Sequence, residues 1–167
     1  MKKTIYILIL ILSLTNQSCG IYSFTGGSVG DAKTIQVPLF LNNAILVEPT
    51  LSSKFTLALQ DKFLQQTNLS LVNANADLTF EGEITNYRSV PIAATANQTA
   101  AQNRLTISVK VRFFNILKED NNFDKSFSHF YDYGANEQLI GSILDDAFDV
   151  IFERITQDIF NASVAQW

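Results

Sequence analysis

Cysteine and histidine, on which much nucleophilic and metal chemistry depends, each occur once in the 167 residues of this chain. A single cysteine forms no internal disulfide and builds no cysteine-based zinc site. The one histidine, His129, lies among Phe127, Phe130 and Tyr131 and is best interpreted as a structural or surface side chain. Gly26-Gly27 is not followed by the Lys-Ser/Thr of a phosphate-binding loop. The sequence therefore predicts a protein that is not an enzyme and uses no metal or other cofactor.

Charge is also scarce, because only 17% of the residues are charged and the net charge is −4. Broad nucleic-acid binding usually needs a basic surface, so this class of partner is disfavoured. Hydrophobic residues make up 47% of the chain, which is enough to bury a core. The length suits a single domain.

The N-terminus has the pattern of an export signal. Lys2 and Lys3 precede an apolar run of about ten residues, from Ile5 to Leu14. A membrane-spanning helix needs roughly 20 apolar residues. Residues 1–18 are therefore expected to be a signal peptide that is removed from the mature protein.

Cys19 follows this run, in the sequence NQSCG. It could be a free exported thiol, half of an intermolecular disulfide, or the site of lipid attachment. Bacterial lipoprotein signals resemble Leu-(Ala/Ser)-(Gly/Ala/Ser)-Cys, which Ser18 fits and Asn16 and Gln17 do not. The position of this sole cysteine favours lipidation at Cys19. Residues 19–33, which hold four of the seven glycines, are expected to be a flexible tether before a domain at 34–167.

Hydrophobic periodicity predicts an α+β domain. Apolar residues alternate with polar ones in two clear strands at 78–85 and 104–113, and they recur at intervals of three and four in two helices at 50–66 and 137–162. Shorter patterns predict further strands at 34–41, 69–72 and 123–133. The expected fold is two helices packed on one face of a small, mainly antiparallel sheet in the order β-α-β-β-β-β-α, with the first strand ending or lying at an edge because of Pro38.

Three cations share the polar face of the 104–113 strand: Arg104, Lys110 and Arg112. If 78–85 and 104–113 form a hairpin with its tip near 94–99, Glu83 lies near Lys110 and Glu81 near Arg112. These carboxylates then neutralise the cations in ion pairs. Alternatively, the cations meet anionic lipid head groups, such as the phosphates of lipopolysaccharide.

Five segments together resemble the LptE-like lipopolysaccharide-assembly lipoproteins of Bacteroidetes-type bacteria. In chain order they are CGIYSFTGGS, EPTLSSKFTLALQDKFLQQTNLSLVN, DLTFEGEITNY, TAAQNRLTISVKVRF and DIFNASVAQW. The resemblance implies a lipid-anchored protein of the outer membrane that faces the periplasm. It also implies a partner, the large β-barrel LptD, in a 1:1 complex in which the lipoprotein plugs the barrel, supports its assembly and binds lipopolysaccharide during its delivery to the outer leaflet.

Two further features bear on this resemblance. The segment 88–103 is uncharged apart from Arg88, which suits a plug that enters a barrel. The alternative function is a periplasmic or surface lipoprotein that carries or binds lipid without a barrel partner. Surface-exported lipoproteins of such bacteria tend to carry acidic residues after the cysteine, whereas Asp31 is the first acid here, which favours the periplasmic leaflet.

Overall fold

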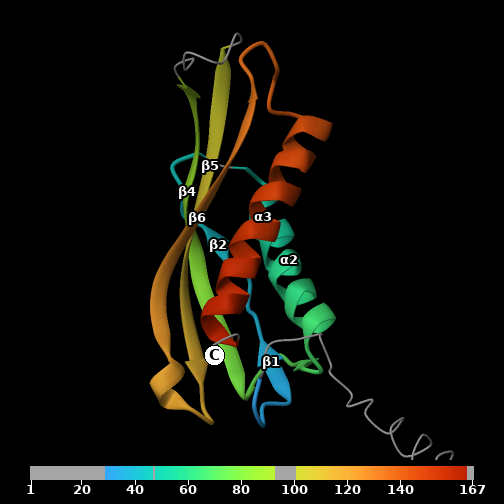
Figure 1. Ribbon diagram of the computed structural model, residues 1–167, viewed down its shortest axis with the longest axis vertical. Helices are drawn as coiled ribbons and strands as arrows, with labels where there is room; N and C mark the ends of the chain where they lie inside the picture. The colour runs from blue at the N-terminus through green and yellow to red at the C-terminus, as the bar shows by residue number, and fades with distance from the viewer. Residues whose placement is uncertain (1–28, 47, 93–100, 165–167) are drawn as a thin grey trace, which may run out of the picture.

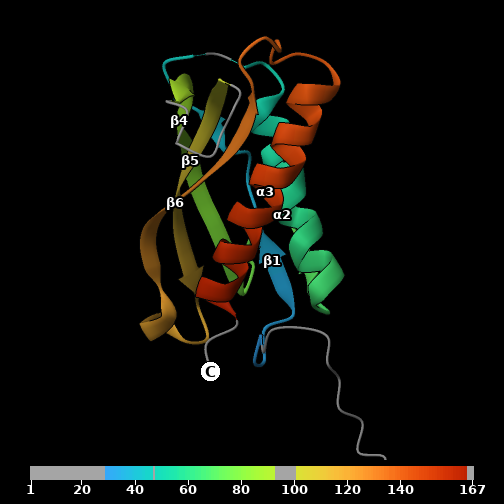
Figure 2. The ribbon, with the colours of Figure 1, turned by 45° about the horizontal axis from the view of Figure 1, so that its top comes forward.

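Two helices lie side by side on one face of a six-stranded sheet, as Figures 1 and 2 show. This computed structural model describes residues 29–46, 48–92 and 101–164. In these residues, the opposite face of the sheet carries no helix, and it is called the open face below. Among the described residues, no helix is both long and apolar enough to cross a membrane. The α+β class and the two-layer arrangement are as the sequence predicts.

Three long antiparallel strands form the main part of the sheet: β4 (Leu78–Ile92), β5 (Gln102–Asn115) and β6 (Phe123–Gly134). Their register confirms the expected hairpin, since Glu81 pairs with Arg112 and Glu83 with Lys110. A register shift between Ile84 and Asn86 does not disturb these two pairs. Both strands extend further toward the hairpin tip than the alternation indicates, and the predicted tip at 94–99 lies outside the described residues.

The rest of the sheet corrects the sequence prediction. The expected strand at 34–41 is interrupted, so that β1 (Thr34–Gln36) and β2 (Leu41–Asn42) are separate and both run parallel to β4. β3 (Ser70–Leu71) pairs in parallel with β1. Pro38, in the gap between β1 and β2, has no N–H to donate to a ladder, which accounts for the interruption. The sheet is therefore mixed, with the order β3-β1-β4-β5-β6 and β2 beside β4.

The first helix, α2 (Leu51–Gln66), agrees with the prediction, whereas α3 (Ser142–Ser163) begins five residues later than Glu137. Gly134 N–H donates to the Glu137 carboxylate at 2.7 Å, and Glu137 N–H donates to the Gly134 carbonyl at 2.9 Å. These bonds hold a turn in place of the first helical turn. Gly141, at φ 56°, then reverses the backbone before the helix. Ile140, inside the predicted helix at 137–162, therefore precedes α3 and is 64% exposed.

Phenylalanine rings fill the space between the helices and the sheet. Phe63 of α2 lies 4.6 Å from Phe80 of β4 and 5.2 Å from Phe160 of α3, between ring centroids. Gly82 makes room for another ring, because a Cβ there would lie 2.6 Å from Cε1 of Phe40 and 2.0 Å from the backbone oxygen of Lys110. The core thus joins both helices to β4 and β5. The other side of these two strands is part of the open face.

Asp77 ties the start of β1 to the start of β4. Its Oδ2 accepts hydrogen bonds from Lys33 N at 2.8 Å, Thr34 N at 3.0 Å and Thr34 Oγ1 at 2.9 Å. Asp77 N–H donates in return to Thr34 Oγ1 at 2.9 Å. The bonds from the Lys33 backbone and from Thr34 lower the pKa of the Asp77 carboxyl below its ordinary value.

This lowered pKa leads to a prediction about acid stability. A carboxylate whose folded pKa is depressed stabilises the fold above its unfolded pKa and loses that contribution as the pH falls through the folded value. We expect Asp77→Asn to be less stable than the unchanged chain at neutral pH, and the difference to shrink as the pH falls below the ordinary pKa of the carboxyl toward its lowered value in the folded protein. Urea denaturation midpoints across this range measure the effect, with Asp120→Asn on an exposed turn as the control. A stability difference that stays constant with pH would contradict the assignment.

Candidate functional site

The open face of the sheet carries the cations that the sequence singles out. Along β5, Leu105, Ile107, Val109 and Val111 are fully buried under the helices, so Arg104, Lys110 and Arg112 point to the other side. Arg88 of β4, which pairs with Thr106, shares this face. Four acidic side chains of the neighbouring strands accompany these four cations: Glu81, Glu83, Asp124 and Asp132. On this face, the four cationic side chains of the three long strands are therefore matched by four acidic ones.

Each of the three candidate cations has an acidic partner, and the partner of Lys110 differs from the expected one. Arg112 Nη2 donates to Glu81 Oε2 at 3.3 Å, as the predicted pairing requires. Lys110 Nζ lies 3.2 Å from Asp124 Oδ2 of β6 and makes no ion pair with Glu83, its partner in the β4–β5 register. The Glu83 carboxylate instead accepts a hydrogen bond from Asn43 Nδ2. Both ion pairs are about half exposed to water, where such pairs contribute little stability.

Arg104 is held much more firmly than the other two. Its Nε and Nη2 donate to the two carboxylate oxygens of Asp132 at 2.7 and 2.8 Å. Its guanidinium lies 3.7 Å from the ring centroid of Phe130. The hydrogen bonds with Asp132 raise the pKa of Arg104 above its ordinary value. Arg104 therefore has fewer donors left for an incoming anion than Arg112, which uses one nitrogen.

A shallow depression of about 210 Å³ lies beside the two loosely held cations. Its lining combines Lys110, Arg112 and Glu83 with Leu41, which is exposed on β2, and with Asn43. A phosphate placed here would meet two cations whose donors are not all used, next to an apolar side chain. Glu83, however, would repel an anion unless a cation stays close to it. Chemically, this depression can exchange ion-pair partners but offers no nucleophile.

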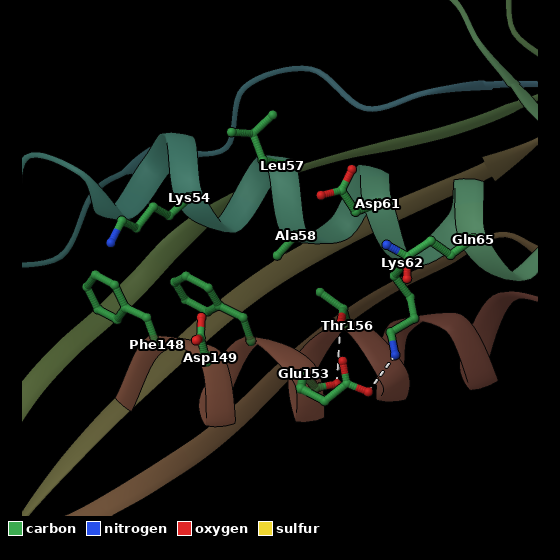
Figure 3. Close-up of a pocket in the computed structure, with 11 residues that line it drawn as sticks. Lys54, Leu57, Ala58, Asp61, Lys62, Gln65, Phe148, Asp149, Glu153 and Thr156 are labelled. Carbon is green, nitrogen blue, oxygen red and sulfur yellow. Dashed lines mark hydrogen bonds and ion pairs between the residues drawn. The ribbon is translucent and has the colours of Figure 1, made fainter. Parts of the chain in front are cut away.

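The larger hollow lies between α2 and α3 and measures about 620 Å³ (Figure 3). Its charged groups bridge the two helices: Lys62 Nζ lies 2.6 Å from Glu153 Oε1, and Lys54 Nζ lies 2.5 Å from Asp145 Oδ1. Lys62 is buried, which makes its pairing with Glu153 a structural requirement. We interpret this groove as a packing feature of the helical layer.

Two other titratable side chains in the described ranges, His129 and Tyr87, have structural roles. His129 Nε2 of β6 lies 2.7 Å from Asp158 Oδ2 of α3, which joins the edge strand to the helix. Burial, with a smaller contribution from Glu48, raises the pKa of Tyr87 to about 12, so this phenol stays neutral. In residues 29–46, 48–92 and 101–164 no three His, Cys, Asp or Glu side chains gather as metal ligands.

Sequence reasoning missed Asp124, Asp132 and Phe130, which hold Lys110 and Arg104. These residues alternate on the 123–133 strand, but the register between β5 and β6 is needed to match them to their cations. Cys19, the predicted lipidation site, lies outside the described residues, as do the signal peptide and most of the tether. Lipidation and head-group binding therefore remain predictions.

Comparison with known proteins identifies a protein family that this chain matches. A family model described as LptE, lipopolysaccharide-assembly, matches residues 32–163. A hypothetical protein, CT253 from Chlamydia trachomatis, has a similar fold, with a TM-score of 0.55 and 11% identity over 81% of this chain and 99% of that one. A minor lipoprotein from Acinetobacter baumannii gives a TM-score of 0.44 and 11% identity over 78% of this chain and 91% of that one. Among curated protein sequences, none matches this chain.

Proposed function

Because this chain belongs to the LptE family of lipopolysaccharide-assembly proteins, we propose that it is an outer-membrane lipoprotein that pairs with an LptD-type β-barrel. In this proposal it supports assembly of the barrel, plugs its lumen and aids insertion of lipopolysaccharide into the outer leaflet. The observation that carries the proposal is the family match over residues 32–163, which spans nearly all of the described domain. The family acts in assembly and is not enzymatic, in agreement with the sequence interpretation.

Cys19 supplies the membrane attachment in this proposal. Cleavage before Cys19 would remove residues 1–18, and acylation would leave a lipid at the new N-terminus. Stable anchoring takes two membrane-binding signals, such as two acyl chains. The folded domain would then face the periplasm on its tether, where it can meet the barrel.

The open face is the surface that we assign to lipopolysaccharide, with Arg104, Lys110 and Arg112 as head-group ligands. Two features support this assignment. Arg112 and Lys110 sit side by side along β5 in half-exposed ion pairs, which an anion of higher charge can replace. Leu41 places apolar surface next to them, which suits a ligand that has both phosphate and hydrocarbon.

A pull-down from detergent-solubilised outer membrane tests the barrel partnership. We expect the affinity-tagged chain to retain a large β-barrel protein in near-equal amount, because a plug is bound one to one. Deletion of residues 92–99 should weaken this retention, since the predicted plug tip lies there. The control is Lys54→Glu on the helical layer, which changes the net charge away from the hairpin and should retain the barrel.

The outcomes of the pull-down separate the two functions. Reproducible absence of a barrel would favour the alternative, a lipoprotein that carries or binds lipid without such a partner. A barrel recovered at full strength by the deletion variant would leave the partnership standing and would refute the plug role of the hairpin tip.

A further inference from the structure

The connection between β5 and β6 exposes three large apolar side chains within four residues. Phe114, Ile116 and Leu117 are 41%, 64% and 49% exposed, and we call them the apolar tip. Single exposed apolar residues are ordinary on protein surfaces, but a cluster of them indicates an interaction site. The short helix η1 (Glu119–Asn121) follows directly and leads into β6.

Hydrogen bonds fix the backbone that presents the apolar tip. The buried Asn115 side chain accepts bonds at 2.9 Å through Oδ1 from both Leu117 N–H and Lys118 N–H. Asn115 N–H donates to Asn122 Oδ1 at 2.7 Å, which closes the turn from the other side. A surface held in this way loses little conformational freedom when it binds, so the tip is ready for a partner.

The described chain begins beside this turn. Val29, Gly30 and Asp31 line a small cavity of about 70 Å³ together with Leu117 and Lys118. Figures 1 and 2 place the start of the described chain and the β5–β6 turn at the same end of the molecule, away from the β6–α3 connection. The ten peptide steps from Cys19 to Val29 reach at most about 36 Å when fully extended. A lipid on Cys19 would therefore tie this end of the domain to within about 36 Å of the membrane.

We propose that the apolar tip docks on the lipid surface that holds the Cys19 anchor, an inference that rests on the proposed lipidation. Ile116 and Leu117 would enter the boundary between head groups and acyl chains, and the Lys118 amine would extend to the head groups. Glu119 and Asp120 are exposed on the same turn. Because these acids offset Lys118, the contact is apolar and should not weaken at high salt. In this docked state the ends of β4 and β5 at Ile92 and Gln102 point away from the lipid, so docking describes the anchored domain before its hairpin meets a barrel.

Fluorescence in reconstituted vesicles tests the docking, using the full chain purified from outer membrane. Since the chain has one cysteine and lipid blocks it in this proposal, Ile116→Cys introduces a single free thiol for an environment-sensitive maleimide dye. Ile140→Cys is the matched control, because Ile140 is equally exposed, at 64%, and belongs to the β6–α3 connection, which lies at the opposite end. The vesicles contain phosphatidylethanolamine, phosphatidylglycerol and a phosphatidylcholine brominated near the top of its acyl chains.

The expected result is a blue shift at position 116 and bromine quenching of about twofold or more, because interfacial apolar groups lie about 5–10 Å into the head-group boundary. The dye at position 140 should stay unquenched, and high salt should leave both signals unchanged. Equal emission and quenching at the two positions would overturn the docking. Shielding at position 116 that arises only when a barrel protein is added would overturn it too, in favour of a protein partner.

Labelling of the unchanged chain with the maleimide dye shows whether a negative result refutes the docking alone or also the lipid anchor at Cys19. If it takes up the maleimide dye, Cys19 is a free thiol, and both the lipid anchor and the docking that rests on it are overturned. If it does not react and position 116 is unquenched in bromolipid vesicles, the anchor stands and the docking alone is wrong.

Discussion

Replacement of Phe63 by alanine is expected to lower the free energy of unfolding by about 3–5 kcal/mol. Phe63 is fully buried on α2 and contacts Phe80 of β4 and Phe160 of α3. Its ring is therefore shared by both helices and the sheet. Truncation removes buried apolar surface and leaves a cavity among aromatic rings that fill the core.

Urea denaturation of the purified protein measures this loss, with Leu64→Ala as the matched control. Leu64 is the next residue of the same helix and is 40% exposed, so its truncation should cost well under about 1 kcal/mol. Similar destabilisation by the two variants would mean that the helical layer does not pack on the sheet as described.

The long elements of this fold could be predicted from sequence because each buries one face. Strict alternation in β4 and β5 marks half-buried strands, and a hairpin with its tip near 94–99 gives their mutual register near Glu81 and Glu83. α2 is likewise visible in its spacing of Leu51, Phe55, Leu59 and Phe63, all buried. Where one face of a helix or strand is apolar and the other is exposed to solvent, hydrophobic burial determines both the type of element and its orientation.

The errors occur where tertiary contacts outweigh the local pattern. Alternation through Ile35, Val37 and Leu39 indicates one strand, yet the chain leaves β1 before Pro38, and Leu39 is exposed. Glu137 suits a helix by propensity, but its carboxylate is needed to hold the Gly134 turn. Parallel pairing of β1 with β3 and β4 joins segments far apart in the chain, and no short-range pattern encodes that pairing.

The candidate site was predictable in part for the same reason. The shared face of Arg104, Lys110 and Arg112 follows from period two and is confirmed. The differences among the three cations depend on β6, which supplies Asp132 and Phe130 to Arg104 but only Asp124 to Lys110. These differences indicate that Lys110 and Arg112 are the more available ligands.

Reversal of both available cations, Lys110→Glu with Arg112→Glu, is expected to weaken binding of purified lipopolysaccharide about 10- to 100-fold. A hydrogen bond to a charged group contributes roughly 1.5–3 kcal/mol, and partial exposure of both side chains reduces this value. Titration calorimetry with purified lipopolysaccharide in detergent gives the dissociation constant. Arg104→Gln should weaken binding less, because the Arg104 guanidinium is already engaged by Asp132.

The control for this reversal is Lys54→Glu with Arg154→Glu, which changes the net charge equally but on the helical layer, away from the depression beside Lys110 and Arg112. Lys54 is a fair match for Lys110, since their side chains are 44% and 45% exposed and each has one acidic partner. If both double variants remain folded and lose affinity alike, long-range attraction by net charge is responsible and no site exists on the open face. Unchanged affinity in the folded Lys110 and Arg112 variant would remove these two residues from lipopolysaccharide binding. A loss confined to that variant would assign the head group to the face of the sheet that the helices leave uncovered.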